Sequence, residues 1–155
     1  MTENGSIQRQ RAIVAEHIAA ENAHDWDAVA NTFVQDDRAF YDVVPISTSF
    51  KGIEGVRGFY AAISAALPDM RVDVRAEYDC AGCSVREVVI SGTHLGDYMG
   101  VPPTGNHVRV DLAAFYLFDE KVEKLIAERI YYDQATVLRQ MQTQAAAAAQ
   151  ASGGL

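Results

Sequence analysis

The sequence is poor in cysteine, proline and positive charge. Its 155 residues include two cysteines, four prolines and 13 Lys or Arg against 21 Asp or Glu, a formal net charge of -8. Such a chain lacks the basic surface that binds nucleic acids or anionic membranes, so we expect neither partner. No apolar run reaches the ~18 residues of a membrane span. Met1–Ser6 shows no basic segment before an apolar core, so we expect no signal peptide and a cytoplasmic location.

Motifs for metals and cofactors are also missing. The cysteines form one pair, Cys80–Ala81–Gly82–Cys83, between two strand-like segments, so we interpret them as thiols on either side of a hairpin turn. Structural zinc needs about four ligands, and the chain has neither a second cysteine pair nor two close histidines. It has no phosphate-binding glycine loop and no nucleophile elbow. We therefore expect no metal and no cofactor.

The order of predicted elements indicates the fold class. Helical periodicity predicts helices over 7–23 and 53–67, a short helix after the N-cap residue Asp25, and a helix over 134–142. Alternation of period two predicts strands over 38–44, 70–75, 83–93, 107–118 and 124–132. Helices followed by antiparallel strands are typical of an α+β fold, with helices packed on one face of a curved antiparallel sheet around a concave pocket. Residues 1–143 should form one domain, and 144–155 an alanine-rich, low-complexity tail.

Glu128 is the first candidate catalytic residue. It shares one face of its predicted strand with Ile126 and Ile130, and a carboxyl group buried among apolar neighbours should have a raised pKa. Such a group can serve as a general acid or base near neutral pH. In the alternative arrangement, Glu128 points outward and pairs with an arginine of a neighbouring strand.

Two further residues are candidate partners of Glu128. His94 lies at a strand end, on a glycine-rich loop, and could transfer a proton or simply be a satisfied structural residue. Asp133 begins the last helix and could be an N-cap or a pocket acid beside Tyr132. The other histidines, His17 and His24 on helix surfaces or caps and His107 on the surface, are not assigned to the site.

A small hydrophobic molecule is the expected ligand. Alternation places either Tyr41 or Asp42 inward, and the loop offers Tyr98 and Asp97, the latter more typical of a turn. We expect substrate contacts from Tyr41, Phe59, Tyr98, Met99, Tyr116, Ile130 and Tyr132.

The glycine-rich loop carries a family resemblance. Residues 92–105 read GTHLGDYMGVPPTG, and further matching stretches lie at 50–60, 67–69, 132–133 and 138–140. Together these stretches, which span roughly 8–142, resemble the SnoaL-like polyketide cyclases, a family with the nuclear transport factor 2 fold.

The resemblance implies a cone-shaped α+β barrel with a deep hydrophobic pocket and cofactor-free acid–base catalysis, classically ring closure by an intramolecular aldol step. In the family's cyclases, an aspartate on the last strand removes the substrate proton and a histidine on the neighbouring strand assists. Those positions are Ile130 and Tyr116 here. Glu128 is therefore the predicted replacement acid, with His94 and Asp133 as partners.

Three functions remain open at this point. The leading hypothesis is a cyclase- or isomerase-like enzyme that acts on a hydrophobic carbonyl compound. An epoxide or lactone hydrolase would instead activate water with Glu128 or Asp133, oriented by Arg129 or Tyr132. The third is a ligand-binding or dimerisation module without catalysis. Ala113, Phe115 and Leu117 place apolar side chains on an outer strand face, which predicts a homodimer.

Overall fold

Three helices precede the main strands in the computed structural model, which describes residues 2–142. Helix α1 (Glu3–Asn22) begins after Thr2, whose side chain accepts a hydrogen bond from the Gly5 N–H. Helix α2 (Trp26–Asn31) is capped by Asp25, as predicted, because its side chain accepts from the Ala28 N–H at 3.0 Å. Helix α3 (Gly52–Ala66) ends two residues before Pro68. The predicted tail at 144–155 lies outside the described residues.

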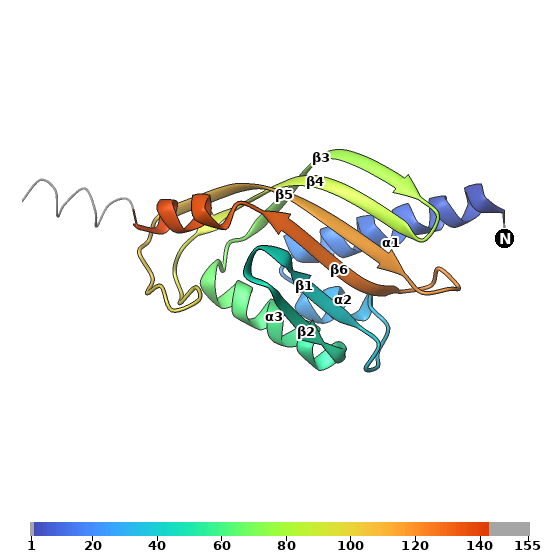
Figure 1. The fold of residues 1–155 in the computed structure, drawn as a ribbon, viewed down its shortest axis with the longest axis horizontal. Coiled ribbons are helices and arrows are strands. Elements are labelled where there is room, and N and C mark those ends of the chain that lie inside the picture. Colours follow the sequence, from blue (N-terminus) through green and yellow to red (C-terminus); the bar gives the residue numbers. More distant parts are fainter. Residues whose placement is uncertain (1, 143–155) are drawn as a thin grey trace, which may run out of the picture.

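Six strands form one sheet in the order β2-β1-β6-β5-β4-β3. The strands are β1 (Phe40–Val43), β2 (Thr48–Lys51), β3 (Arg71–Cys80), β4 (Cys83–Thr93), β5 (His107–Phe118) and β6 (Leu125–Tyr132), with a 3-10 turn, η1 (Val44–Ile46), between β1 and β2. Neighbouring strands are antiparallel except β1 and β6, which pair in parallel. The predicted antiparallel sheet is therefore correct for four of its five pairings (Figure 1).

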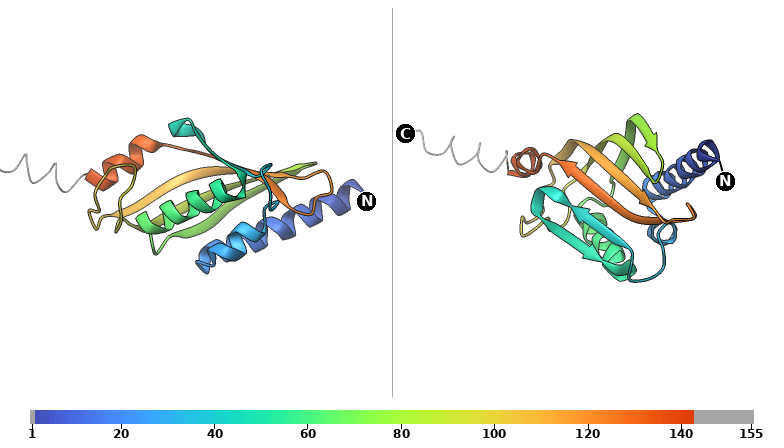
Figure 2. Two further views of the ribbon diagram at one scale, coloured as in Figure 1. Left: turned by 90° about the horizontal axis from the view of Figure 1, so that it is seen from below. Right: turned by 45° about the vertical axis from the view of Figure 1, so that its right-hand side comes forward.

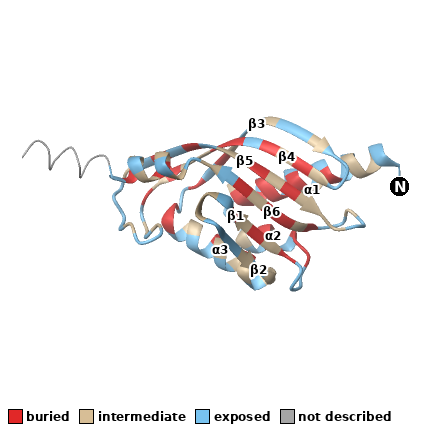
Figure 3. Ribbon diagram, in the orientation of Figure 1, coloured by how far each residue is buried: buried red, intermediate tan, exposed pale blue. Residues whose placement is uncertain are grey.

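The sheet curves around the helices and encloses the core. α3 lies under the arch of the strands, whereas α1 runs along the β3 side (Figure 2). Buried residues concentrate where the helices meet the inner sheet face (Figure 3). This is the expected α+β arrangement. In the described part of the chain, no helix combines the length and apolar character needed to cross a bilayer.

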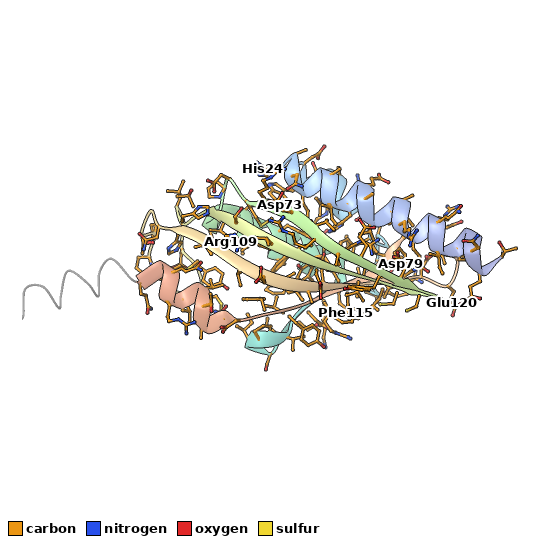
Figure 4. The ribbon with its side chains drawn as sticks, turned by 90° about the horizontal axis from the view of Figure 1, so that it is seen from above. His24, Asp73, Asp79, Arg109, Phe115 and Glu120 are labelled. Atoms are coloured by element: carbon orange, nitrogen blue, oxygen red, sulfur yellow. The ribbon has the colours of Figure 1, made fainter. Side chains whose placement is uncertain are left out.

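Polar contacts hold α1 against the β3–β4 hairpin. The Gln10 amide donates to the Cys80 carbonyl at 3.0 Å, and Arg11 pairs with Asp79 at 2.6 Å beside the helix (Figure 4). Cys80 and Cys83 face each other across the turn as free thiols, which confirms the predicted hairpin. Gly82 supplies the positive φ of 80° that this turn requires.

Candidate active site

A cavity of about 170 Å³ lies between α3 and the inner face of the sheet. Most of its wall is aliphatic or aromatic, which suits a small apolar ligand. The wall includes every residue predicted to contact substrate: Tyr41, Phe59, Tyr98, Met99, Tyr116, Ile130 and Tyr132. Strand alternation accounts for Tyr116, Ile130 and Tyr132, because β5 and β6 direct every second side chain inward. The other four residues come from β1, α3 and the glycine-rich loop.

Glu128 faces this cavity. It is 3% exposed and lines the wall, so it adopts the inward arrangement rather than the outward one. The strand register sets Tyr116 beside it on β5 and Tyr41 beside it on β1. Its carboxylate accepts a hydrogen bond from the Tyr60 hydroxyl at 2.9 Å and lies 3.2 Å from His17 Nε2. The adjacent Arg129 pairs with Asp42 instead, at 2.9 Å.

Three residues of this cluster were not predicted as site residues: His17 and Glu21 on α1, and Tyr60 on α3. His17, expected on a helix surface, is instead 0% exposed, and its Nε2 lies 3.5 Å from Glu21 Oε1. The Tyr60 hydroxyl lies 3.1 Å from His17 Nε2 and 3.2 Å from Glu21 Oε1. We call His17, Glu21, Tyr60 and Glu128 the inner cluster.

Thr32 fixes the orientation of the His17 ring. The Thr32 hydroxyl donates its one proton to the Val29 carbonyl at 2.7 Å, so it must accept from His17 Nδ1 at 2.8 Å. The Nδ1 atom therefore carries a proton. This leaves Nε2 as the atom that either accepts or shares a proton with the two carboxylates.

Burial and charge interactions shift the pKa values of two members of the inner cluster, His17 and Glu21. Burial by itself lowers the pKa of His17, but attraction to Glu21 and Glu128 outweighs burial and raises the pKa to about 10. Burial raises the pKa of Glu21, with a further contribution from the charge on Glu128, although the His17 imidazolium opposes this shift. Two carboxylates and one imidazolium carry a formal charge of -1, which one additional proton would neutralise.

Three tyrosine hydroxyls surround the carboxylates. Burial raises the pKa of Tyr41, Tyr60 and Tyr116 well above the usual value, and the charges on Glu128 and Glu21 raise it further. These hydroxyls therefore stay protonated at neutral pH. They can donate hydrogen bonds to a carboxylate or to a ligand oxygen.

The two predicted partners of Glu128 lie elsewhere. His94 is buried but does not line the cavity; its Nδ1 lies 2.9 Å from Thr104 Oγ1, and its backbone pairs with Gly105 and Asn106 to close the loop. Asp133 is exposed and caps the last helix by accepting from the Thr136 hydroxyl and the Ala135 N–H, which lowers its pKa. The expectation that these two side chains join Glu128 in the pocket is therefore wrong, because loop closure and helix capping hold them outside.

The other end of the cavity has polar groups of its own. The Tyr98 hydroxyl donates to Gln134 Oε1 at 2.8 Å and lies 3.0 Å from the Tyr132 hydroxyl. Met99, 56% exposed, and Asp97 complete this end, and Asp97 also accepts from the Gly100 N–H in the turn predicted for it. The glycine-rich loop thus contributes to the cavity through residues 97–99.

Within residues 2–142, one set of His and Glu side chains has the spacing of a metal site. The ligand atoms of His17, Glu21 and Glu128 lie within 4.8 Å of one another. The same atoms are at hydrogen-bond distances from Tyr60, so shared protons satisfy this geometry without an ion.

Comparison with known proteins agrees with this fold. The family model for SnoaL-like polyketide cyclases matches residues 11–141. The chain belongs to this family. No curated protein matches this SnoaL-like chain.

Solved structures show the same fold as this SnoaL-like protein. A candidate SnoaL-like polyketide cyclase from Jannaschia sp. CCS1 superposes with a TM-score of 0.77 at 20% identity, covering 86% of this chain and 92% of that one. IdmH, a candidate polyketide cyclase from Streptomyces antibioticus, gives 0.69 at 22% identity and covers 84% and 96%. A Catenulispora acidiphila protein with a ketosteroid isomerase-like fold, in complex with trimethylamine, gives 0.69 at 22% and covers 83% and 91%. At these identities the likeness shows the fold alone.

This SnoaL-like chain places its acids differently from the pattern implied by the resemblance. Ile130 and Tyr116, at the positions where an aspartate and a histidine were expected, both line the cavity. The acidic and basic groups come instead from Glu128, two residues before Ile130 on the same face of β6, and from His17 and Glu21 on α1. The inner cluster thus brings an imidazole and two carboxylates to a site where the expected pair is absent.

Proposed function

We propose that this protein is a cofactor-independent acid–base enzyme that enolises a small hydrophobic carbonyl compound, as in isomerase or cyclase reactions. The observation that carries the proposal is the pair of buried carboxylates, Glu21 and Glu128, on the wall of an apolar cavity beside protonated tyrosine hydroxyls. A purely ligand-binding module has no need for two costly buried acids at its pocket wall. A buried acid with a raised pKa in a cleft, such as Glu21, is typical of catalytic sites.

The chemistry follows from the positions of these groups. A carboxylate oxygen of the Glu21–Glu128 pair takes a proton from the carbon next to the substrate carbonyl, and the electron pair of that C–H bond forms the enolate. A tyrosine hydroxyl donates to the enolate oxygen, where a preorganised donor lowers the barrier most. The proton then returns to another carbon of the substrate, or the enolate carbon attacks a second carbonyl whose oxygen takes the proton.

The two carboxylates act as one proton-sharing unit. Glu128 has Tyr60 and His17 as polar partners, with Tyr41 and Tyr116 adjacent to it in the sheet. Glu21 is within hydrogen-bond distance of Tyr60 and His17 and has the raised pKa. Because the groups interact, the exchangeable proton belongs to the pair rather than to either residue.

Exchange of α-protons tests this proposal without knowledge of the natural substrate. The probe is 2-tetralone, a bicyclic ketone, and its deuterium uptake in D₂O is followed by proton NMR. We expect exchange well above the buffer rate, and a loss of about 100-fold or more in Glu128→Gln and in Glu21→Gln. Glu16→Gln, an exposed glutamate on the same helix, is the matched control and should exchange like the parent protein.

Two results would contradict the proposal. One is exchange no faster than in buffer for 2-tetralone and for related bicyclic ketones. The other is exchange that survives unchanged in both glutamine variants while circular dichroism shows them folded. The second result would remove the carboxylate pair from the mechanism even if the protein were active.

A further inference from the structure

The end of the cavity opposite the inner cluster is a second polar site. It consists of the hydroxyls of Tyr98 and Tyr132, held together at 3.0 Å and supported by Gln134; we call these two hydroxyls the outer pair. They come from separate segments: Tyr98 from the glycine-rich loop and Tyr132 from the end of β6. Both tyrosines line the cavity, so a ligand inside it can reach them.

The hydrogen bonds of the outer pair define what it offers a ligand. Each hydroxyl has one proton, and Tyr98 donates its proton to Gln134 Oε1 at 2.8 Å. The contact with Tyr132 is then made by the Tyr132 proton, which points at the Tyr98 oxygen. Both protons are committed, whereas lone pairs remain on the Tyr132 oxygen. The outer pair is therefore an acceptor for a hydrogen-bond donor of the ligand.

The spacing along β6 sets the length of that ligand. Glu128 and Tyr132 lie four residues apart on one strand face, which separates their Cα atoms by roughly 13 Å. The wall between them is apolar, with Ile130 on β6 and Val110, Leu112 and Ala114 on β5. A bound molecule that meets both ends thus has an apolar body of about two fused rings with one polar group at each end.

We propose that the outer pair is a binding subsite for a hydroxyl group on the far end of the substrate, such as a phenol or an enol. This inference rests on the proposed function, because the inner cluster holds the reacting carbonyl. The substrate class is then an elongated hydroxylated ketone. The carbonyl end accepts hydrogen bonds at the inner cluster, and the hydroxyl end donates one at the outer pair.

A pair of matched probes tests the subsite. The probes are 2-tetralone and 6-hydroxy-2-tetralone, which carries a hydroxyl on the ring remote from the ketone. Dissociation constants are measured by calorimetry on the full chain, and KM and kcat by α-proton exchange. We expect the hydroxylated probe to bind about tenfold more tightly to the parent protein, the effect of one well-placed hydrogen bond.

Removal of single hydroxyl groups should abolish that preference. In Tyr132→Phe the two probes should bind equally, because the acceptor oxygen for the remote hydroxyl is gone. Tyr98→Phe should reduce the preference as well, because the Tyr132 hydroxyl then loses its partner. The matched control is Tyr131→Phe, the exposed neighbour on the opposite strand face, which should keep the full preference.

The possible failures can be told apart. Equal binding of both probes to the parent protein, or a preference that persists in Tyr132→Phe, would overturn the subsite while leaving exchange of 2-tetralone intact. If the preference disappears in Tyr132→Phe but the parent protein shows no exchange activity, the subsite is upheld as a binding site and the enzymatic proposal is overturned.

Discussion

At the scale of single residues, the inner cluster depends on His17. Glu21 and Glu128 are both buried, and two unpaired carboxylates in an apolar cavity would be very costly. The imidazolium of His17 lies between them at 3.5 and 3.2 Å, and Thr32 holds its ring in place. A neutral histidine would leave the pair without a counter-charge.

The raised pKa of His17 predicts a particular loss of stability with pH. Its folded pKa of about 10 lies above the ordinary histidine value of 6.5, so protonation favours the folded state. This contribution is fully present below pH 6.5 and is lost as pH rises towards about 10. For one proton, the free energy of unfolding should fall by about 1.4 kcal/mol per pH unit in that window. Urea unfolding at pH 6, 8 and 9.5 measures the slope.

Proton NMR of the imidazole checks the same prediction directly. The His17 ring signal, assigned by its absence in His17→Gln, should keep its protonated chemical shift between pH 6 and 9. His107→Gln, which removes an exposed imidazole, should leave the stability slope unchanged. A His17 signal that titrates near pH 6.5, or a stability that does not vary across the window, would show that the cluster does not hold an imidazolium.

Only part of the candidate site could be read from the sequence. Glu128 was predicted because a carboxylate interrupts a clear alternation of apolar residues on β6. His17 and Glu21 were not, because both are polar residues on a helix, where the buried face is normally predicted from apolar positions. The buried stripe is Gln10, Val14, His17, Ile18 and Glu21, so polar residues take positions normally held by apolar ones. The available signal was the position of His17 and Glu21 three and seven residues after Val14, a spacing that places all three on one helix face.

At the scale of elements, regular strands were predicted most accurately. The ranges 83–93 and 107–118 agree with β4 and β5 to the residue, because long alternation leaves little freedom in register. The short strand β2 has no such pattern and was not predicted. The parallel pairing of β1 with β6 could not be predicted either, since it joins segments more than 80 residues apart; it nevertheless places Tyr41 next to Glu128.

The glycine-rich loop is attached to the end of α3 through Gly96. The N–H groups of Leu95 and Gly96 both donate to the Ala66 carbonyl, at 3.0 and 3.3 Å, and so satisfy an acceptor at the helix terminus. A Cβ atom on Gly96 would lie 2.1 Å from the Ala65 oxygen. The glycine is therefore required by close approach of two backbones rather than by a positive φ.

Alanine substitutions at two glycines should have opposite effects on stability. Gly96→Ala must push the loop away from α3, and we expect a loss of about 1–3 kcal/mol. Gly58→Ala lies on the exposed side of α3 with open space around its Cβ, so it should stabilise the protein by about 0.5–1 kcal/mol. Urea unfolding of both variants measures the difference. A neutral Gly96→Ala would mean that the loop is not packed against the helix end.

At the scale of the whole molecule, the outer face of the sheet is apolar where it should meet water. Phe115 and Leu117 on β5 are only partly covered, and Tyr131 of β6 is 44% exposed and packs edge-on against Phe115 at 5.5 Å. Tyr78 on β3 is 56% exposed. It pairs in the sheet with Val85 on β4, and Val85 pairs with Phe115 on β5. The patch thus spans four neighbouring strands, and a contiguous patch of this kind is typical of an interaction surface.

We predict a homodimer through this face, with a strength that rises with salt. Each chain carries a formal charge of -8, so two copies repel each other at low ionic strength, and added salt screens that repulsion. Light scattering after size exclusion should give twice the chain mass at micromolar concentration in 0.15 M salt.

Two charged variants on the outer sheet face test this homodimer. Tyr131→Glu, and independently Phe115→Glu, should give monomers, because each buries a charge in the apolar contact. Leu95→Glu, which is equally charged but lies on the exposed loop, should stay dimeric. A monomeric parent protein, or a dimer that survives both sheet variants, would place the self-association surface elsewhere or remove it altogether.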